Sequence, residues 1–177
     1  MSILADFKSY PTRPSSAQDE EPVRMFKSDF LEKFTHISPL TVLVIWLPVA
    51  AILIWLNAAA GGNVWLRIPA GVVIGIVLVW TFIEYIMHRF IFHFKPRNDW
   101  QEKALFVMHE VHHVQPNCKT RLVMPPILSV SIAAMFWLMF VMVVDKLLGA
   151  PIWVAPLFAG SILGYVLYDM THYAVHH

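Results

Sequence analysis

Residues 39–87 have the sequence PLTVLVIWLPVAAILIWLNAAAGGNVWLRIPAGVVIGIVLVWTFIEYIM, in which two apolar runs flank the turn Gly61-Gly62-Asn63. Each run is long enough for a helix that crosses a bilayer, which needs about 20 residues. The first run opens with Ser38 and Pro39, residue types favoured at a helix start. We therefore predict two spans, over 39–59 and 64–87, that form a helical hairpin.

Two further apolar runs predict a second hairpin. One begins at Pro125-Pro126 and ends before Asp145-Lys146, and the other runs from Pro151 to Tyr168. Hydrophobic residues make up 58% of the chain and charged residues 14%, which excludes an ordinary soluble domain. The predicted fold is all-α: an integral membrane protein with four transmembrane helices in two hairpins and a cytosolic, histidine-rich helical cap. We expect a polar N-terminal arm over residues 1–37 and a membrane domain over 38–177.

Lysine and arginine are distributed unevenly between the two sides of the predicted spans. Eleven of the 13 lie before the first span or between the second and third, whereas Arg67 and Lys146 belong to the short links. Because cytoplasmic segments carry the excess of these residues, both termini and the central segment are predicted to be cytoplasmic. The net charge of +1 argues against nucleic acid as a partner. Cys118 is the only cysteine, so an intramolecular disulfide and a thiolate zinc site are excluded.

Eight of the nine histidines occur in three clusters, each at a place where an apolar run gives way to polar sequence. The first cluster is His88 with His93, the second His109 with His112 and His113, and the third His172 with His176 and His177. Neutral imidazole binds iron, zinc, copper and nickel, and eight imidazoles exceed the capacity of one ion. The clusters therefore predict a site for two metal ions at the cytoplasmic surface of the membrane.

Helix geometry relates the members of each cluster. At about 100° per residue, the three histidines of the second cluster share one face of a helix, and so do His172 and His176. His88 and His93 would stand about 140° apart on a regular helix. Either the helix departs from regular geometry there or the two side chains bind different ions.

Two carboxylates precede histidine clusters at helical spacing. Glu84 lies four residues before His88, and Asp169 lies three residues before His172. Each is a candidate acceptor for the N–H of a metal-binding imidazole. The N-terminal arm is expected to be flexible or to lie on the surface, with His36 an ordinary solvated histidine, and residues 100–114 are expected to be helical.

Three segments resemble the fatty acid 2-hydroxylase branch of the fatty acid hydroxylase/sterol desaturase superfamily. They are EYIMHRFIFHF (84–94), HEVHHVQPNCKTRLVMPP (109–126) and GYVLYDMTHYAVHH (164–177). The resemblance implies a membrane oxygenase that places a hydroxyl at C2 of a long-chain fatty acid or acyl lipid, using O2 and two electrons. It implies two metal ions, with iron expected for activity and zinc in preparations. It carries the ligand role onto His88, His93, His109, His112, His113, His172, His176 and His177.

Further expectations follow from this resemblance. Tyr165, Tyr168 and Tyr173 are candidates for contacts with the substrate head group or with oxygen, and interface packing is the alternative. Arg89 and Arg121 are candidates to pair with an acidic head group, although the charge bias explains both without a ligand.

The two ends of the sequence differ from the family pattern. Family members continue past the equivalent of His177 with another histidine cluster, so this chain is expected to be a fragment or to lack part of one metal's coordination. The HPGG pattern of a fused cytochrome b5 domain does not occur. Electrons are therefore expected from a separate carrier that is cytochrome b5-like or ferredoxin-like, which favours a bacterial inner membrane over the endoplasmic reticulum.

Three alternatives stay open. Oxidation of a sterol or carotenoid by the same superfamily would use the same histidines with a differently shaped lipid cavity. A metal transporter is a second alternative, although transport sites tend toward the bilayer midplane and these clusters lie beyond the spans. A non-catalytic metal-binding protein is the third.

Overall fold

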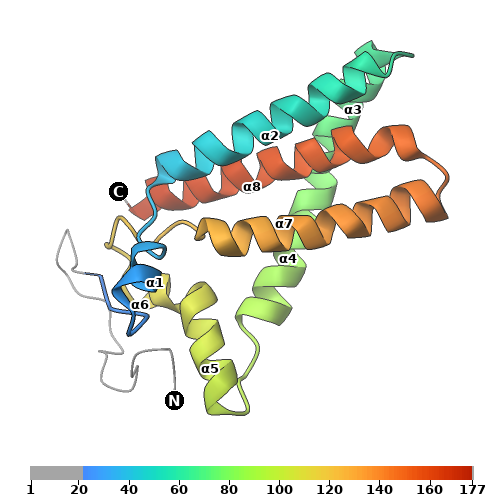
Figure 1. Ribbon diagram of the computed structural model, residues 1–177. Coiled ribbons are helices and arrows are strands. Elements are labelled where there is room, and N and C mark those ends of the chain that lie inside the picture. Colours follow the sequence, from blue (N-terminus) through green and yellow to red (C-terminus); the bar gives the residue numbers. More distant parts are fainter. Residues whose placement is uncertain (1–21, 177) are drawn as a thin grey trace. The chain divides into compact units, whose positions relative to one another are not determined.

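The computed structural model describes residues 22–176, and this part of the chain is helical and contains no β-strand (Figure 1). Within residues 22–176, four helices are long and apolar enough to cross a membrane: Pro39–Ala59, Val64–Phe92, Pro126–Leu147 and Pro151–His176. The predicted all-α class with four spans is confirmed, and the protein is an integral membrane protein. The second and fourth helices run beyond the predicted spans, because each continues into a histidine cluster.

Several of the spans combine α-helical and π-helical segments. The first span is α2 (Pro39–Ala59). The remaining segments in chain order are α3 (Val64–Ile74), η2 (Gly75–Trp80), α4 (Thr81–Ile86), η3 (Met87–Phe92), α5 (Asp99–Leu105), η4 (Phe106–Glu110), α6 (Val111–Val114), α7 (Pro126–Phe140), η5 (Val141–Leu147), η6 (Pro151–Trp153) and α8 (Val154–His176). A short helix, α1 (Asp29–Lys33), precedes them. The segments η2, η3, η4 and η5 are π-helical, and η6 is a 3-10 turn.

The chain divides into two compact units. The bundle unit consists of residues 40–85 and 130–168. The histidine unit consists, within the described residues, of 22–39, 86–129 and 169–176. All the described histidines of the three clusters therefore belong to one unit.

In the bundle unit, α8 is the central helix. In its most apolar stretch 56% of the residues are buried, against 17–22% in the other three spans. The ring of Tyr165 on α8 contacts the rings of Trp46 on α2 and Trp80 on η2, and Phe158 contacts Trp137 on α7. Figure 1 shows α2 and α8 side by side. The most buried span is thus the one that touches each of the others.

Glycines bring α8 into backbone contact with the second span. A Cβ added at Gly75 would lie 2.3 Å from the carbonyl oxygen of Leu157, and one added at Gly160 would lie 2.3 Å from that of Val72. In lipid, helices associate through close packing of this kind, because the solvent provides no hydrophobic force between them. A side chain at either glycine would push the two helices apart.

A buried arginine holds the turn between α2 and α3. Gly61 and Gly62 have φ angles of 75° and 79°, which glycine adopts without strain. Arg67 donates hydrogen bonds of 2.9 Å to the side-chain oxygen and the carbonyl of Asn57 and to the carbonyl of Gly61. The Asn57 amide donates to the carbonyl of Ile152 at 2.8 Å. A cation at the carbonyl end of α2 is favoured by the helix dipole, and the network connects the two hairpins.

In the histidine unit, residues 22–37 pack against the helix that carries the second cluster. Met25 is 1% exposed and forms a small core with Phe106 and Val111. The backbone amide of Val23 donates to the side-chain oxygen of Gln115 at 2.7 Å. Of the two interpretations of the N-terminal arm, the surface-lying one applies to residues 22–37; residues 1–21 lie outside the described residues.

Arg121 fastens this segment to the loop after the second cluster. Its side chain is 0% exposed and donates to the Glu32 carboxylate at 2.5 Å and to the Val23 carbonyl at 2.8 Å. The other oxygen of Glu32 accepts from the backbone amides of Met25 and Phe26 at 2.9 and 2.8 Å. Arg121 is therefore enclosed by protein groups, which leaves no room for the predicted pairing with a head group.

His36 lies at the edge of this network. Its Nδ1 atom is 3.3 Å from the hydroxyl of Thr120, and its Nε2 atom is 3.5 Å from the Glu32 carboxylate. The side chain is 34% exposed. His36 is thus only partly solvated, because the folded N-terminal segment covers part of its side chain.

Candidate metal centre

Four histidine rings from two helices place their Nε2 atoms in a chain of three close contacts. The Nε2 atom of His93 lies 3.1 Å from that of His88 and 3.2 Å from that of His109. The Nε2 atom of His113 lies 3.2 Å from that of His109. We call these four side chains the Nε2 group. They unite the whole first cluster with two members of the second.

A π-helical turn brings the two histidines of the first cluster together. The segment η3 covers Met87–Phe92, and the amide of His93 donates to the carbonyl of His88 at 3.2 Å. Such an i→i+5 bond adds a residue to the helical turn, a feature common at functional sites. It reduces the offset of about 140° that a regular α-helix would impose. Of the two predicted alternatives, the departure from regular helix is the one found.

Hydrogen bonding alone does not explain the Nε2 group. Each imidazole Nε2 offers either one proton or one lone pair. His93 and His109 each face two other Nε2 atoms, so at most two of the three contacts can be hydrogen bonds. Nitrogens that bind one ion tetrahedrally at about 2.0 Å lie about 3.3 Å apart, close to the three distances found. The donor set therefore fits a metal ion.

The remaining histidines extend the group. The ring centroid of His112 lies 4.3 Å from that of His109 and 5.0 Å from that of His172, and His176 lies 5.0 Å from His172. The Nε2 atom of His112 is buried and has no hydrogen-bond partner among residues 22–176. Buried polar atoms are normally paired, so this nitrogen points to a ligand such as a metal ion. Seven of the eight predicted ligands thus form one continuous set, and His177 lies outside the described residues.

Burial keeps the second cluster in the form that binds metals. Burial, together with the charges of His88, His113 and His93, lowers the pKa of His109 to about 3. Burial, followed by the charges of His109 and His113, lowers the pKa of His112 to about 2. Burial and the neighbouring His93 also lower the pKa of His113. All three imidazoles are consequently neutral at pH 7, with lone pairs available to a cation.

Phe92 is a component of this site that the sequence analysis missed. Its ring is stacked on that of His109, with centroids 4.7 Å apart and planes 12° apart, and the residue is 5% exposed. The stacking fixes the ring plane of the most central imidazole. In the sequence, Phe92 is one apolar residue among many at the end of a span. Its position between His88 and His93 is the one feature of the sequence that could have placed Phe92 in the site.

The other predicted residues are divided between the units. Asp169 is 5% exposed, and both it and the half-buried Tyr173 belong to the histidine unit. Glu84 and Tyr168 belong to the bundle unit. Their proposed roles stay predictions.

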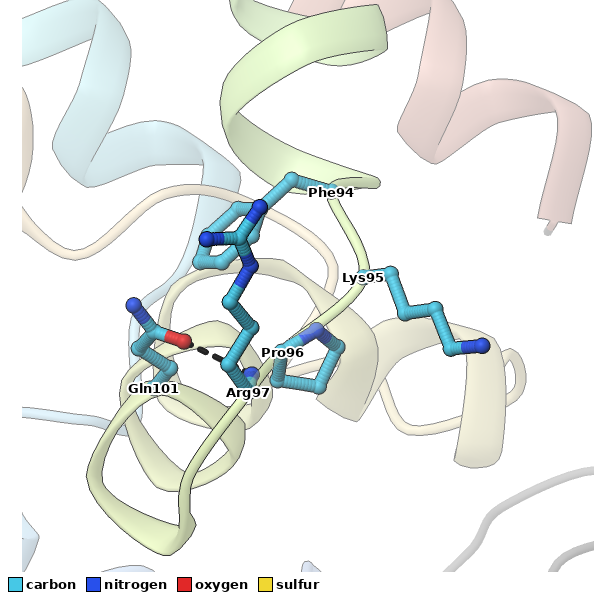
Figure 2. Close-up of a pocket in the computed structure, with 5 residues that line it drawn as sticks. All are labelled: Phe94, Lys95, Pro96, Arg97 and Gln101. Carbon is cyan, nitrogen blue, oxygen red and sulfur yellow. Dashed lines mark hydrogen bonds between the residues drawn. The ribbon is translucent and has the colours of Figure 1, made fainter.

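A surface pocket directly follows the first cluster. Figure 2 shows its lining side chains, which are Phe94, Lys95, Pro96, Arg97 and Gln101. The side-chain oxygen of Gln101 accepts a hydrogen bond of 2.7 Å from the backbone amide of Arg97. This bond ties the loop that leaves the second span to the first turn of α5.

Four apolar helices and a convergent set of histidines define a class of integral membrane proteins with a histidine-based metal site. A family model described as fatty acid hydroxylase matches residues 73–177, and the chain belongs to the fatty acid hydroxylase family. The predicted membership of a monooxygenase enzyme family is confirmed, and so is the resemblance to its 2-hydroxylases.

The chain is 37% identical over 172 residues to the dihydroceramide fatty acyl 2-hydroxylase FAH1 of Arabidopsis thaliana, covering 97% of this chain and 69% of that one. It is 36% identical to the fatty acid 2-hydroxylase of Mus musculus, covering 88% and 45%. The structure of full-length scs7p, with only the hydroxylase domain visible, matches with a TM-score of 0.76 and 34% identity over 86% of this chain and 56% of that one. The chain thus spans about half the length of the mouse relative and of scs7p.

Proposed function

We propose that this chain forms the catalytic part of a membrane enzyme that hydroxylates C2 of a long-chain fatty acid or acyl lipid at a two-metal centre. The close contacts among the four Nε2 atoms carry the proposal, because such a donor set suits a first-row transition metal and is not explained by hydrogen bonds. The two relatives described above are named as 2-hydroxylases of fatty acids or fatty acyl groups, which supports the assignment of the reaction.

The histidines fall into two ligand sets. His88, His93, His109 and His113 are assigned to one ion. His112, His172 and His176 are assigned to a second ion, with His177 as a further ligand. Asp169 and Glu84 are proposed to accept the remaining ring N–H of a ligand, which would fix its tautomer and orientation.

The reaction inserts one oxygen atom into a C–H bond at C2. The other oxygen atom of O2 leaves as water, with two electrons and two protons from outside the substrate. The C2–H bond of an acyl chain is too weakly acidic for a side-chain base alone. Iron bound at this site would supply the activation of O2 that this bond requires. The protein contributes neutral, preorganised imidazoles, and the Phe92 ring restrains His109.

The substrate is proposed to approach from the bilayer. Its apolar tail would lie between helices, and its carboxyl, thioester or amide head would remain at the cytoplasmic surface. Tyr168 and Tyr173 are proposed to contact the head group or oxygen. The cytoplasmic orientation of the histidines rests on the charge bias. A bacterial inner membrane remains our proposal for the location, although the relatives described above are eukaryotic.

The test combines metal analysis with product analysis. The full-length protein is loaded with iron and supplied with reductant, O2 and a long-chain fatty acid, and the 2-hydroxy acid is measured by mass spectrometry. His112→Ala and His172→Ala are expected to lower metal content and product, whereas His36→Ala leaves metal content unchanged. Absence of any 2-hydroxy product from the loaded wild type would refute the reaction. Equal metal loss in all three variants would refute the ligand assignment.

Parallel samples separate the alternatives. A sterol or carotenoid supplied in place of the fatty acid tests the sister reaction. Metal flux in proteoliposomes without O2 consumption would favour transport. Metal binding with neither product nor flux would favour a non-catalytic protein.

A further inference from the structure

The Nε2 group has one buried side and one exposed side. His109 is 7% exposed and stacked on Phe92, whereas His93 and His113 are exposed. A redox partner can therefore approach the metal ligands most closely at His93 and His113. His93 is also the ligand that immediately precedes the surface pocket of Figure 2.

Two cations without an acidic partner stand beside this exposed ligand. Lys95 and Arg97 are exposed, and neither forms an ion pair with any residue that the structure describes. Figure 2 shows the Lys95 amine on one side of the loop and the Arg97 guanidinium on the other, next to Phe94 and Gln101. The acidic residues of α5, Asp99 and Glu102, do not line the pocket.

We propose that this pocket and its two cations are the docking surface for an acidic electron-carrier protein or domain. The inference rests on the proposed function, because the hydroxylation consumes two electrons that must reach the metal ligands from a donor. A one-electron carrier would have to bind and leave twice in each cycle. A surface that attracts by charge suits such repeated encounters, because it raises association rates without requiring tight binding.

The local structure favours a partner that binds in one orientation over one that is only attracted by charge. The hydrogen bond between Gln101 and the Arg97 amide fixes the loop, so a partner meets the cations in a set position. Phe94 lines the pocket, and Trp100, which is 74% exposed, follows on α5. Aromatic side chains among cations are typical of the residues that dominate protein interfaces. Carboxylates on the partner would complete the two ion pairs.

The experiment compares two electron sources with the same enzyme. Iron-loaded full-length protein in neutral phospholipid vesicles hydroxylates a fatty acid with either a reduced soluble cytochrome b5 domain or dithionite. For the double variant Lys95→Glu with Arg97→Glu, the KM for the carrier is expected to rise about tenfold or more and its dependence on salt to flatten. The rate with dithionite is expected to stay within about twofold of the wild type.

A matched control carries the same charge change elsewhere on the unit. Lys27→Glu with Lys33→Glu reverses two exposed cations of the N-terminal segment and is expected to alter neither rate. An unchanged carrier KM in the Lys95 and Arg97 variant would overturn the inference. An equal loss of hydroxylation rate with the carrier and with dithionite would also overturn it. If that equal loss appeared only in vesicles that contain anionic phospholipid, the result would mean that the pocket binds lipid. A wild type that forms no product even with dithionite would instead refute the proposed function.

Discussion

Replacing Arg121 with methionine is expected to release residues 22–37 from the histidine unit. Methionine has similar length and no charge, so the change removes the guanidinium with little loss of volume. The acceptors that lose their donor include the Glu32 carboxylate at 2.5 Å, the carbonyls of Val23 and Thr35 at 2.8 and 3.1 Å, and the sulfur of Met25 at 3.3 Å. Because the segment packs on the helix that carries the second cluster, its release would also loosen that helix.

The structure sets the size of the effect. Breaking a buried ion pair by removing one partner costs about 3–5 kcal/mol. Glu32 is 13% exposed and keeps two backbone donors, so its charge stays partly stabilised in the variant. We therefore expect a cost of about 2–3 kcal/mol for local opening. At about 1.4 kcal/mol per factor of ten, amide protection in residues 23–37 falls roughly 30- to 100-fold.

Hydrogen exchange measured by mass spectrometry in detergent micelles reads this opening directly. Glu32→Gln is expected to lower protection by a similar amount, because it leaves the Arg121 cation buried without its anion. The double variant is expected to be little worse than either single one, since the two residues act as a pair. Lys33→Met, the same type of change at an exposed position, serves as the control.

Two outcomes would refute this reasoning. Protection that changes less than about threefold in Arg121→Met would mean that the apolar contacts of the segment hold it without the ion pair. Strictly additive losses in the double variant would mean that Arg121 and Glu32 act independently.

Three further predictions concern the segment, the site and the bundle. Burial opposes ionisation of Glu32, but backbone amides and Arg121 outweigh it and hold its pKa below 4.5. The stabilisation that the ionised Glu32 provides is therefore full above pH 4.5 and is lost as pH falls through the lowered pKa. Peptic digestion of residues 22–37 will detect this loss, and Glu32→Gln will abolish the pH dependence. Phe92→Ala is expected to lower metal affinity about tenfold in equilibrium dialysis, with Phe92→Leu intermediate, and equal affinity in all three proteins would remove the stacked ring from the site. Gly160→Leu is expected to destabilise the protein by about 3 kcal/mol or more in detergent unfolding, because its side chain meets backbone, whereas Ala58→Leu on an exposed helix face changes little.

Local patterns were enough to predict much of this architecture. The first span begins at Pro39 and ends at Ala59 as predicted, because lipid leaves a long apolar run no alternative to a helix. The second and fourth helices extend past the predicted ends. A hydrophobicity pattern stops at the first polar residues, whereas the backbone hydrogen bonds continue through His88 and His172.

The contacts of residues 22–37 with the histidine unit could not be predicted from local sequence. Nothing near Glu32 signals that its partner is Arg121, because the two lie 89 positions apart and each alone has the appearance of a solvated charge. The stacking of Phe92 on His109 was missed for a similar reason, since an apolar residue at a membrane boundary normally needs no partner.

The sequence by itself determined the helical membrane class, the positions of the spans and the residue type of the candidate metal ligands, because hydrophobicity and ligand chemistry are properties of single residues and short runs. Tertiary structure alone decided that His93 meets His88 through a π-turn and that His93 also meets His109, which in turn meets His113. It also decided which imidazoles are buried and which face solvent. These outcomes depend on backbone geometry and packing between distant segments, which no single stretch of sequence contains.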